Sequence, residues 1–199
     1  MNVAIIGAGA FAREIRAHLS LGDSVPMFVD DEYFVENNQN IKPLSTLNVD
    51  VYEVIVSVAD PIKRSEIVKR LPKETKYLTF IHPSAILLDD NIKIGAGSII
   101  CANCILTTNI EIKDHCHLNL KTTIGHDCVI GDFFTTAPNV SISGNCTIGD
   151  RVYIGTSASI KEKISICSDV TIGLNAGVVK NIDKKGTYVG TPAKLINKL

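Results

Sequence analysis

Residues 116–145 read CHLNLK TTIGHD CVIGDF FTTAPN VSISGN, five consecutive hexads that share one pattern. The third residue is aliphatic in four of them, with Thr136 as the exception, and the first residue is mostly small or β-branched. The same register runs without a gap over fifteen hexads, from Ile92 to Asn181. A period of six fits neither a helix nor a hairpin array. It predicts short strands joined by tight corners, three strands to each coil of a parallel β-helix.

Fifteen hexads give five coils of 18 residues, in which positions one and three of each hexad point inward and stack on the same positions one coil away. Cys104, Cys116, Cys128 and Cys146 occupy first positions, so we expect them to fill the core. The glycines that follow the aliphatic residue suit corners where φ can be positive. The segment ILLDDN (86–91) is a candidate for one further hexad.

Residues 1–80 follow a different pattern, in which apolar runs alternate with helical segments. This alternation predicts a small parallel sheet, half of a Rossmann-like fold. The expected elements are strands at 3–7, 26–31, 51–59 and 76–81, and helices at 7–19 and 61–71. The segment IHPSA (81–85) is the expected junction to a second domain, 81–199, whose tail ends in a short segment, AKLINKL, with helical character.

The composition restricts the possible partners. The chain has 199 residues, is 45 % hydrophobic and carries a net charge of −1, which argues against nucleic acid or an anionic membrane as a general partner. No apolar run is long enough to span a membrane, and the N-terminus lacks the features of a signal peptide. We therefore expect a cytoplasmic protein whose six cysteines are reduced.

A glycine turn, Gly7-Ala-Gly9-Ala-Phe-Ala12, follows the first strand and opens the first helix. Free N–H groups at a helix N-terminus bind phosphate, and the glycines allow close approach of the backbone. Asp30 ends the second strand, where an acid can hold a ribose hydroxyl. A plain tight turn is the simpler explanation. If a nucleotide binds, a domain of this size suits a mononucleotide such as the UDP of a sugar nucleotide.

His126 and Asp127 occupy positions five and six of their hexad, so we expect the imidazole to project outward from a corner. Asp127 can raise the basicity of the imidazole through its charge. The residue stacked on His126 one coil later is Gly144, whose N–H would be open to a developing oxyanion. Solvated surface is the alternative explanation for this pair.

Two further motifs have competing explanations. His115, Cys116 and His117, with His126, suggest a three-histidine metal site between subunits, as in hexapeptide-repeat carbonic anhydrases. The segment YVGTPAK (188–194) is typical of hexapeptide acyltransferases, near the coenzyme A, but it would also serve as a plain terminating turn.

In this order, GAGAFARE, FVDD, IHPSA, GHDCVIGDF and YVGTPAK make the whole chain resemble bacterial sugar acetyltransferases of the sialic acid O-acetyltransferase (NeuD/PglD) type. The resemblance implies a left-handed β-helix, a homotrimer with active sites between neighbouring β-helices, acetyl-CoA as donor, and a sugar nucleotide held by the N-terminal domain. No metal is expected.

By position, the resemblance makes His126 the general base, Asp127 its tuning partner, Gly144 an oxyanion donor and Asn119 a substrate contact. It assigns residues on the second domain to acetyl-CoA, namely Thr135, Thr156 and Leu174. It assigns residues on the first domain to the nucleotide sugar, namely Gly9, Ala10, Phe11, Asp30 and Asp31. The chain departs from the family pattern at Ala10-Phe11, where Gly-His is common, at Thr135, where histidine is common, and near Val58-Ala59, where a glycine is expected.

Three hypotheses follow. The first is acetyl-CoA-dependent N-acetylation of a nucleotide-linked 4-amino-4,6-dideoxy sugar for surface glycan synthesis, with UDP or dTDP as the nucleotide. The second is O-acetylation of sialic acid or another free sugar. The third is a metal-dependent hydratase or a non-catalytic β-helix protein.

Overall fold

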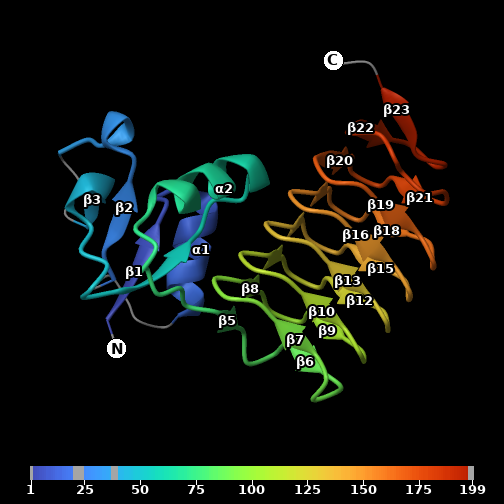
Figure 1. Ribbon diagram of the computed structural model, residues 1–199, viewed down its shortest axis with the longest axis horizontal. Coiled ribbons are helices and arrows are strands. Elements are labelled where there is room, and N and C mark those ends of the chain that lie inside the picture. The colour runs from blue at the N-terminus through green and yellow to red at the C-terminus, as the bar shows by residue number, and fades with distance from the viewer. Residues whose placement is uncertain (1, 20–24, 37–39, 197–199) are drawn as a thin grey trace. The chain divides into compact units, whose positions relative to one another are not determined.

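The computed structural model describes residues 2–19, 25–36 and 40–196, and the chain divides into two compact units, 1–79 and 80–199 (Figure 1). The division falls within one residue of the expected domain boundary. None of the helices in the described part of the chain has the length and apolar character of a membrane span.

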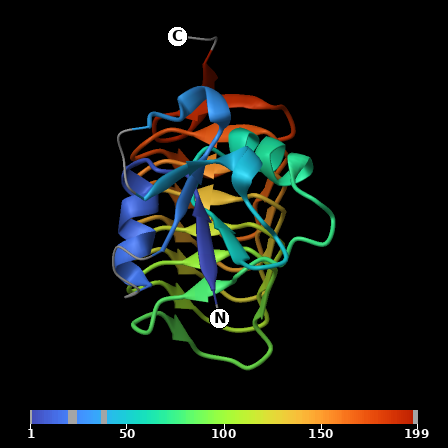
Figure 2. The same ribbon diagram turned by 90° about the vertical axis from the view of Figure 1, so that its left-hand side faces the viewer.

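The first unit is a small parallel sheet with two helices. Its strands lie in the order β3-β2-β1-β4, and in Figure 2 helix α1 lies to the left of the strands and α2 to their right. The elements are β1 (Val3–Ile6), α1 (Ala10–His18), β2 (Met27–Val29), the 3₁₀ turn η2 (Asp31–Tyr33), β3 (Ile41–Pro43), the 3₁₀ turn η3 (Leu44–Thr46), β4 (Glu53–Val56) and α2 (Pro61–Arg70).

The predicted strand at 76–81 is wrong as a member of this sheet. Tyr77 forms only an isolated bridge to Val54, while Phe80 and Ile81 pair with β8 (Ile99–Ile100) in the second unit. The fourth strand of the small sheet is instead β3, which is only three residues long. It ends in Pro43, which an edge strand tolerates. Three residues are too few to show a periodicity in the sequence.

The second unit is a parallel β-helix made of three sheets. The five-stranded sheet contains β7 (Lys93–Ile94), β10 (Glu111–Ile112), β13 (Val129–Ile130), β16 (Thr147–Ile148) and β19 (Ser165–Ile166). The six-stranded sheet contains β6 (Ile86–Leu87), β9 (Ile105–Leu106), β12 (Thr123–Ile124), β15 (Ser141–Ile142), β18 (Ser159–Ile160) and β21 (Gly177–Val178). The eight-stranded sheet contains β5 (Phe80–Ile81), β8 (Ile99–Ile100), β11 (His117–Leu118), β14 (Thr135–Thr136), β17 (Tyr153–Ile154), β20 (Val170–Ile172), β22 (Gly186–Val189) and β23 (Lys194–Ile196).

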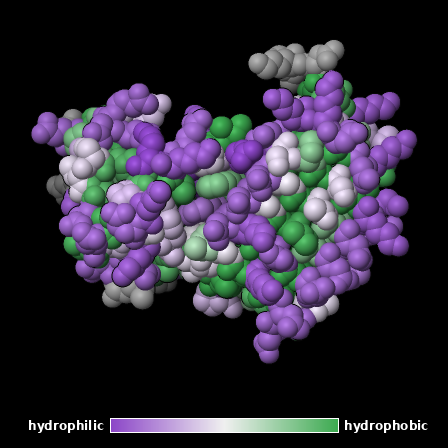
Figure 3. Space-filling model, viewed as in Figure 1, coloured by the Kyte–Doolittle hydropathy of each residue, from purple (hydrophilic) through white to green (hydrophobic). Residues whose placement is uncertain are grey.

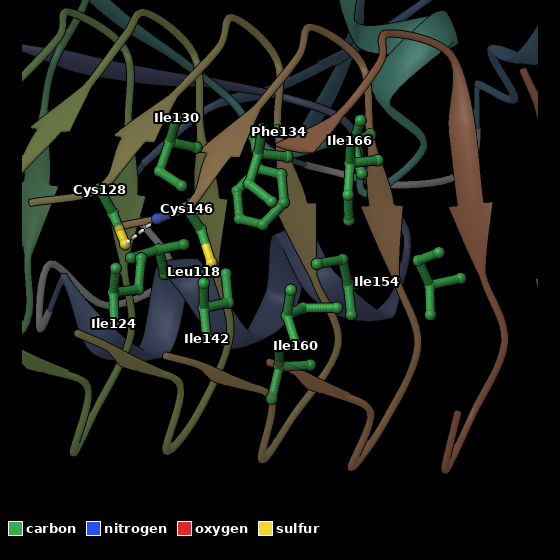
Figure 4. Packing of buried hydrophobic residues seen from close by; sticks show 14 of the residues in the cluster. Leu118, Ile124, Cys128, Ile130, Phe134, Ile142, Cys146, Ile154, Ile160 and Ile166 are labelled. Carbon is green, nitrogen blue, oxygen red and sulfur yellow. Dashed lines mark hydrogen bonds between the residues drawn. The ribbon is translucent and has the colours of Figure 1, made fainter. Parts of the chain in front are cut away.

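The predicted hexad register is confirmed. Strands pair with the strand 18 residues later, for example Ile112 with Ile130, and the first and third positions form one continuous buried core. Figure 4 shows these side chains directed into the interior, among them Cys128, Cys146 and Phe134. The four first-position cysteines are fully buried, as core filling requires.

The coils turn at three corners, which we name after one residue each. The His126 corner comprises residues 107–109, 125–127, 143–145 and 161–163. The Asp132 corner comprises residues 95–97, 113–115, 131–133, 149–151 and 167–169. The Thr156 corner comprises residues 101–103, 119–121, 137–139, 155–157 and 173–175. Over fourteen consecutive hexads, from 92 to 175, the sixth residue has a positive φ, and only one of these residues, Gly97, is glycine.

The fourth-position glycines are therefore not explained by positive φ, contrary to our expectation. A Cβ on Gly125 would lie 2.6 Å from the backbone nitrogen of Gly144, and a Cβ on Gly131 would lie 2.7 Å from the carbonyl carbon of Gly149. At these glycines the next coil approaches so closely that a Cβ would collide with its backbone, and this close approach favours glycine there.

Two end segments differ from expectation. Ile86 pairs with Ile105 and Leu87 with Leu106, so ILLDDN belongs to the β-helix in a register shifted by one residue. This shift leaves Leu88 exposed, where the expected register made it inward-facing. At the other end, residues 194–196 form β23, antiparallel to β22, rather than a helix. Residues 197–199 of the predicted helix lie outside the described residues.

Candidate active site

His126 lies on an outward corner of the β-helix, as the register predicts. The corner follows β12, and the side chains of His126 and Asp127 are 55 % and 44 % exposed. Asp127 has a φ of +58°, which short polar residues adopt more readily than bulky ones. The local sequence thus turns both side chains to the surface.

The imidazole and the carboxylate form a hydrogen-bonded pair. Nδ1 of His126 lies 2.7 Å from Oδ2 of Asp127, and Oδ1 of Asp127 accepts a hydrogen bond of 2.6 Å from the Asn109 side-chain amide. These bonds, the one from Asn109 first, hold the pKa of the Asp127 carboxyl below its usual value. An ionised carboxylate at Nδ1 favours the tautomer with the proton on Nδ1, which leaves the Nε2 lone pair free to accept a proton.

Gly144 lies against the His126 ring. A Cβ at this position would be 2.6 Å from Nε2, so the absence of a side chain lets the imidazole lie across the backbone of the next coil. The Gly144 N–H donates no hydrogen bond within the described residues, while the Gly144 carbonyl accepts one from Lys163. The imidazole thus covers the Gly144 backbone, which is buried, and the oxyanion role of the Gly144 N–H stays a prediction.

The other predicted contacts of this domain lie elsewhere in a single chain. Asn119 is on the Thr156 corner, where its Oδ1 accepts a hydrogen bond from the N–H of Leu120. Thr135 is buried in β14, and Thr156 and Leu174 are exposed on the Thr156 corner, Leu174 to 70 %. The structure thus places these four residues together on one side of the coil and does not bring them to the His126 corner.

The N-terminal unit contains a cavity of about 930 Å³ at the glycine turn. Its lining includes Gly9, Ala10, Phe11 and Asp30, which the sequence assigned to the nucleotide sugar. A helix N-terminus on the rim of a cavity of this size suits a phosphorylated ligand.

The two predicted acids have different environments. Asp30 lines the cavity and is held by Arg70, whose terminal nitrogen lies 2.7 and 3.0 Å from its two oxygens. The Asp31 carboxylate instead accepts a hydrogen bond of 3.1 Å from the Ser45 N–H, and bonding to Ser45 lowers the pKa of Asp31. Asp31 lines a neighbouring hollow with Ser45 and is absent from the lining of the main cavity.

Sequence reasoning missed Arg70 and Lys63, which also line this cavity. Both belong to α2, whose N-terminus is capped by the Asp60 side chain through hydrogen bonds from Ile62 and Lys63. Arg70 lies 40 residues from Asp30 in the chain, and no spacing in the sequence connects them. Only the fold of the unit shows that they meet.

Within one chain, the histidines of the metal site that was predicted between subunits do not converge. His115 stacks on Phe133 at the Asp132 corner, His117 is buried in β11, and His126 is on a different corner. Within the described ranges, no group of three histidine, cysteine or acidic side chains is arranged to hold a metal ion.

A coiled β-helix with an outward His-Asp corner and a terminating YVGTPAK turn defines a hexapeptide-repeat acyltransferase. Residues 2–71 match the family model of the PglD N-terminal domain. The chain is 30 % identical over 153 residues to GDP-perosamine N-acetyltransferase of Escherichia coli O157:H7, covering 70 % of this chain and 69 % of that protein. It therefore belongs to the sugar acetyltransferases of the NeuD/PglD type, and the predicted family is confirmed.

Solved structures agree with this assignment. WeeI from Acinetobacter baumannii AYE has a TM-score of 0.87 and 29 % identity, covering 98 % of this chain and all of that one. The acetyltransferase domain of PglB from Neisseria gonorrhoeae FA1090, in complex with acetyl coenzyme A, has a TM-score of 0.83 and 26 % identity over 98 % of both chains. The predicted β-helix fold and the predicted acetyltransferase class are confirmed.

Proposed function

We propose that this protein transfers the acetyl group of acetyl-CoA to the amino group of a nucleotide-linked amino sugar. The observation that carries the proposal is the Asp127–His126 pair lying against the bare backbone of Gly144. The cavity at the glycine turn supports a nucleotide-linked substrate over a free sugar such as sialic acid. The relative in Escherichia coli is a GDP-perosamine N-acetyltransferase, so GDP joins UDP and dTDP as a candidate nucleotide.

The geometry supports direct transfer with His126 as the base. The amine nitrogen attacks the thioester carbonyl, and Nε2 takes the amine proton as the C–N bond forms. The carbonyl oxygen becomes an oxyanion, toward which the Gly144 N–H donates. The C–S bond then breaks, and the proton on Nε2 passes to the departing thiolate. No acyl-cysteine is needed, and Cys128, nearest in sequence, is fully buried inside the coil.

A neighbouring copy would complete the site. Asn119, Thr156 and Leu174 lie on a different corner from His126, and Thr135 lies in the strand that leads to that corner, so one chain alone presents two separate halves. Exposed apolar residues on the β-helix, including Val129, Leu174 and Val179, suit burial between copies, and apolar surface is visible on this unit in Figure 3. A homotrimer gives each His126 corner a neighbouring wall.

Subunit mixing tests this arrangement. Co-expression of His126→Ala with Thr156→Arg chains should restore activity, because some interfaces then pair an intact His126 corner with an intact Thr156 corner. Light scattering should give three times the chain mass of 21.5 kDa. A monomer at micromolar concentration, or the absence of any restored activity, would overturn the shared site.

We assign the N-terminal unit to nucleotide-sugar binding, and the reaction to the cytoplasm, where acetyl-CoA and nucleotide sugars are made. Calorimetric titration with GDP-, UDP-, dTDP- and CMP-linked sugars tests the substrate class.

Asp30→Ala should weaken nucleotide-sugar binding by roughly 10- to 150-fold, the size of a lost hydrogen bond to a charged group. Acetyl-CoA binding should not change. Asp31→Ala is the matched comparison, since its carboxylate bonds to Ser45 rather than lining the cavity. Unchanged affinity in both variants would favour O-acetylation of a free sugar.

A further inference from the structure

Asn109 forms a third member of the His126 corner, one coil before the catalytic pair. It is the sixth residue of its hexad, with a φ of +50°, and stacks directly below Asp127, 18 residues later. Its amide nitrogen donates to Oδ1 of Asp127, and Oδ2 is thereby left to His126. Each carboxylate oxygen thus has one partner, and the two bonds fix the carboxylate from opposite sides.

The kind of donor matters as much as the bond. Asp169 is the sixth residue of its hexad at the Asp132 corner, and there Arg151 holds the carboxylate with two hydrogen bonds of 2.7 and 3.1 Å. A guanidinium fixes an acid and also cancels its charge. At Asp127 the only ion-pair partner among the described residues is His126, and the second partner is a neutral amide. The negative charge therefore remains available to an imidazolium formed during the reaction.

We propose that Asn109 is a positioning residue that holds the Asp127 carboxylate toward His126 without neutralising it. The inference rests on the proposed role of His126 as the base. Its consequence is that removal of Asn109 lets Asp127 rotate away, and the imidazole loses the partner that keeps its proton on Nδ1. Asn109 touches neither Nε2 nor the reacting atoms, so its whole effect should act through Asp127.

The test uses glycine substitutions, because glycine accepts the positive φ and removes only the side chain. Asn109→Gly should lower kcat about 10-fold, consistent with the loss of one hydrogen bond to a charged group, with little change in KM. Arg151→Gly is the matched control, since Arg151 is also a sixth-position residue, with a φ of +53°, and also holds the acid one coil later, but it lies on the Asp132 corner. Its kcat should not change.

Two readouts separate positioning from a general structural role. In an Asp127→Asn background, the Asn109→Gly substitution should have no further effect on kcat, because non-additivity marks residues that act as one unit. The side-chain ¹⁵N shifts of His126 should report the Nδ1–H tautomer in the parent protein and a mixture in Asn109→Gly. Full additivity with Asp127→Asn, or an unchanged tautomer, would overturn the proposal.

The two levels of inference fail differently. If His126→Ala retains activity, the proposed base is wrong and the role of Asn109 falls with it. If His126→Ala is inactive while Asn109→Gly keeps the parental kcat and tautomer, only the positioning role is wrong.

Discussion

The Asp132 corner and the His126 corner have the same backbone geometry and the same hexad positions, yet they use the fifth residue differently. At the Asp132 corner four fifth-position side chains accept a hydrogen bond from the backbone of the coil before them, namely Asp114, Asp132, Asp150 and Ser168. The N–H of Asp132 donates to Asp150, and the N–H of Asp114 donates to Asp132, both at 3.0 Å. The resulting ladder of carboxylates links coil to coil and satisfies backbone donors that would otherwise depend on water.

At the His126 corner this ladder is interrupted. The residue one coil after His126 is Gly144, which has no side chain to bond to the preceding backbone. The imidazole occupies the space that a side chain at 144 would fill, and the His126 N–H, from which such a side chain would accept, has no partner within the described residues. In the proposed function, the reactive corner is thus the one where the side chain that would accept this backbone hydrogen bond is missing.

The largest expected effect is on the reactive residue itself. His126→Ala should lower kcat by roughly 10²–10⁴, the range for a general base, with little change in stability because the side chain is largely exposed. Steady-state kinetics on the acetyl transfer measures it. The matched variant is Asp132→Ala, at the same hexad position on the other corner, which should keep the parental kcat. More than a third of parental activity in His126→Ala, with chemistry rate-limiting, would remove the distinction between the corners.

A smaller effect is expected at the glycine. Gly144→Ala should lower kcat by about 10- to 100-fold, because the added Cβ displaces the ring from its productive position. The melting temperature should change little, since the colliding atoms end a flexible side chain. Gly131→Ala is the contrasting variant, because its Cβ meets backbone of the next coil, and it should lower the melting temperature. The interpretation fails if Gly144→Ala destabilises the protein as much as Gly131→Ala does.

Substitutions in the carboxylate ladder of the Asp132 corner should lower stability without changing kcat. Asp150→Ala leaves the N–H of Asp132 without its acceptor and should lower the free energy of unfolding by about 1–2 kcal/mol, while kcat stays at the parental value. Urea unfolding midpoints, measured beside activity, test both parts. A loss of activity without a loss of stability would show that the Asp132 corner also takes part in the reaction.

The smallest expected effect is a pH-dependent difference at Asp127. Hydrogen bonds from Asn109 and then His126 lower the pKa of this carboxyl below its usual 3.8. A lowered pKa in the folded state contributes stability above the unfolded value, and this contribution is lost as the pH falls through the folded value. Near pH 7 the parent should therefore melt slightly above Asp127→Asn, by no more than about 2 °C for so exposed a group. Below about pH 3 the difference in melting temperature between the parent and Asp127→Asn should decrease. A difference that increases in acid would contradict the expected direction of the pH dependence.

How much could be predicted from the sequence differs between the two units. The β-helix was predictable because each coil places an aliphatic residue at the same inward position. Ile112, Ile130 and Ile148 therefore all indicate the same hexad register. The strand β3 was missed because three residues are too few to show a hydrophobic periodicity. The pairing of Phe80 with β8 was missed because an apolar run does not show which sheet the strand will join. The reason for the fourth-position glycines was missed because close approach between coils is a property of the stacked structure.

The candidate site shows the same limit. That His126, Asp127 and Gly144 lie together could be predicted, because the sequence shows where the repeat is broken and the 18-residue coil gives the residues that stack. Asn109 also lies 18 residues from Asp127, but several other sixth positions are asparagine. Only the structure shows that the Asn109 amide donates a hydrogen bond to Asp127. No fixed spacing in the sequence relates Arg70 to Asp30, because an α/β unit brings distant residues together without a repeat.

The shifted register at ILLDDN bears on how this fold can change over evolutionary time. Seven residues, 85–91, occupy the place of a hexad, yet Lys93 and Ile94 pair with Glu111 and Ile112 at the ordinary spacing. One inserted residue was thus absorbed at a single corner, and its effect did not spread along the chain. This corner therefore accommodates one extra residue without a change in the pairing of the strands that follow it. Such a lineage can lengthen the loops around a reaction centre, and so adjust which sugar is accepted, while the core stays as it was.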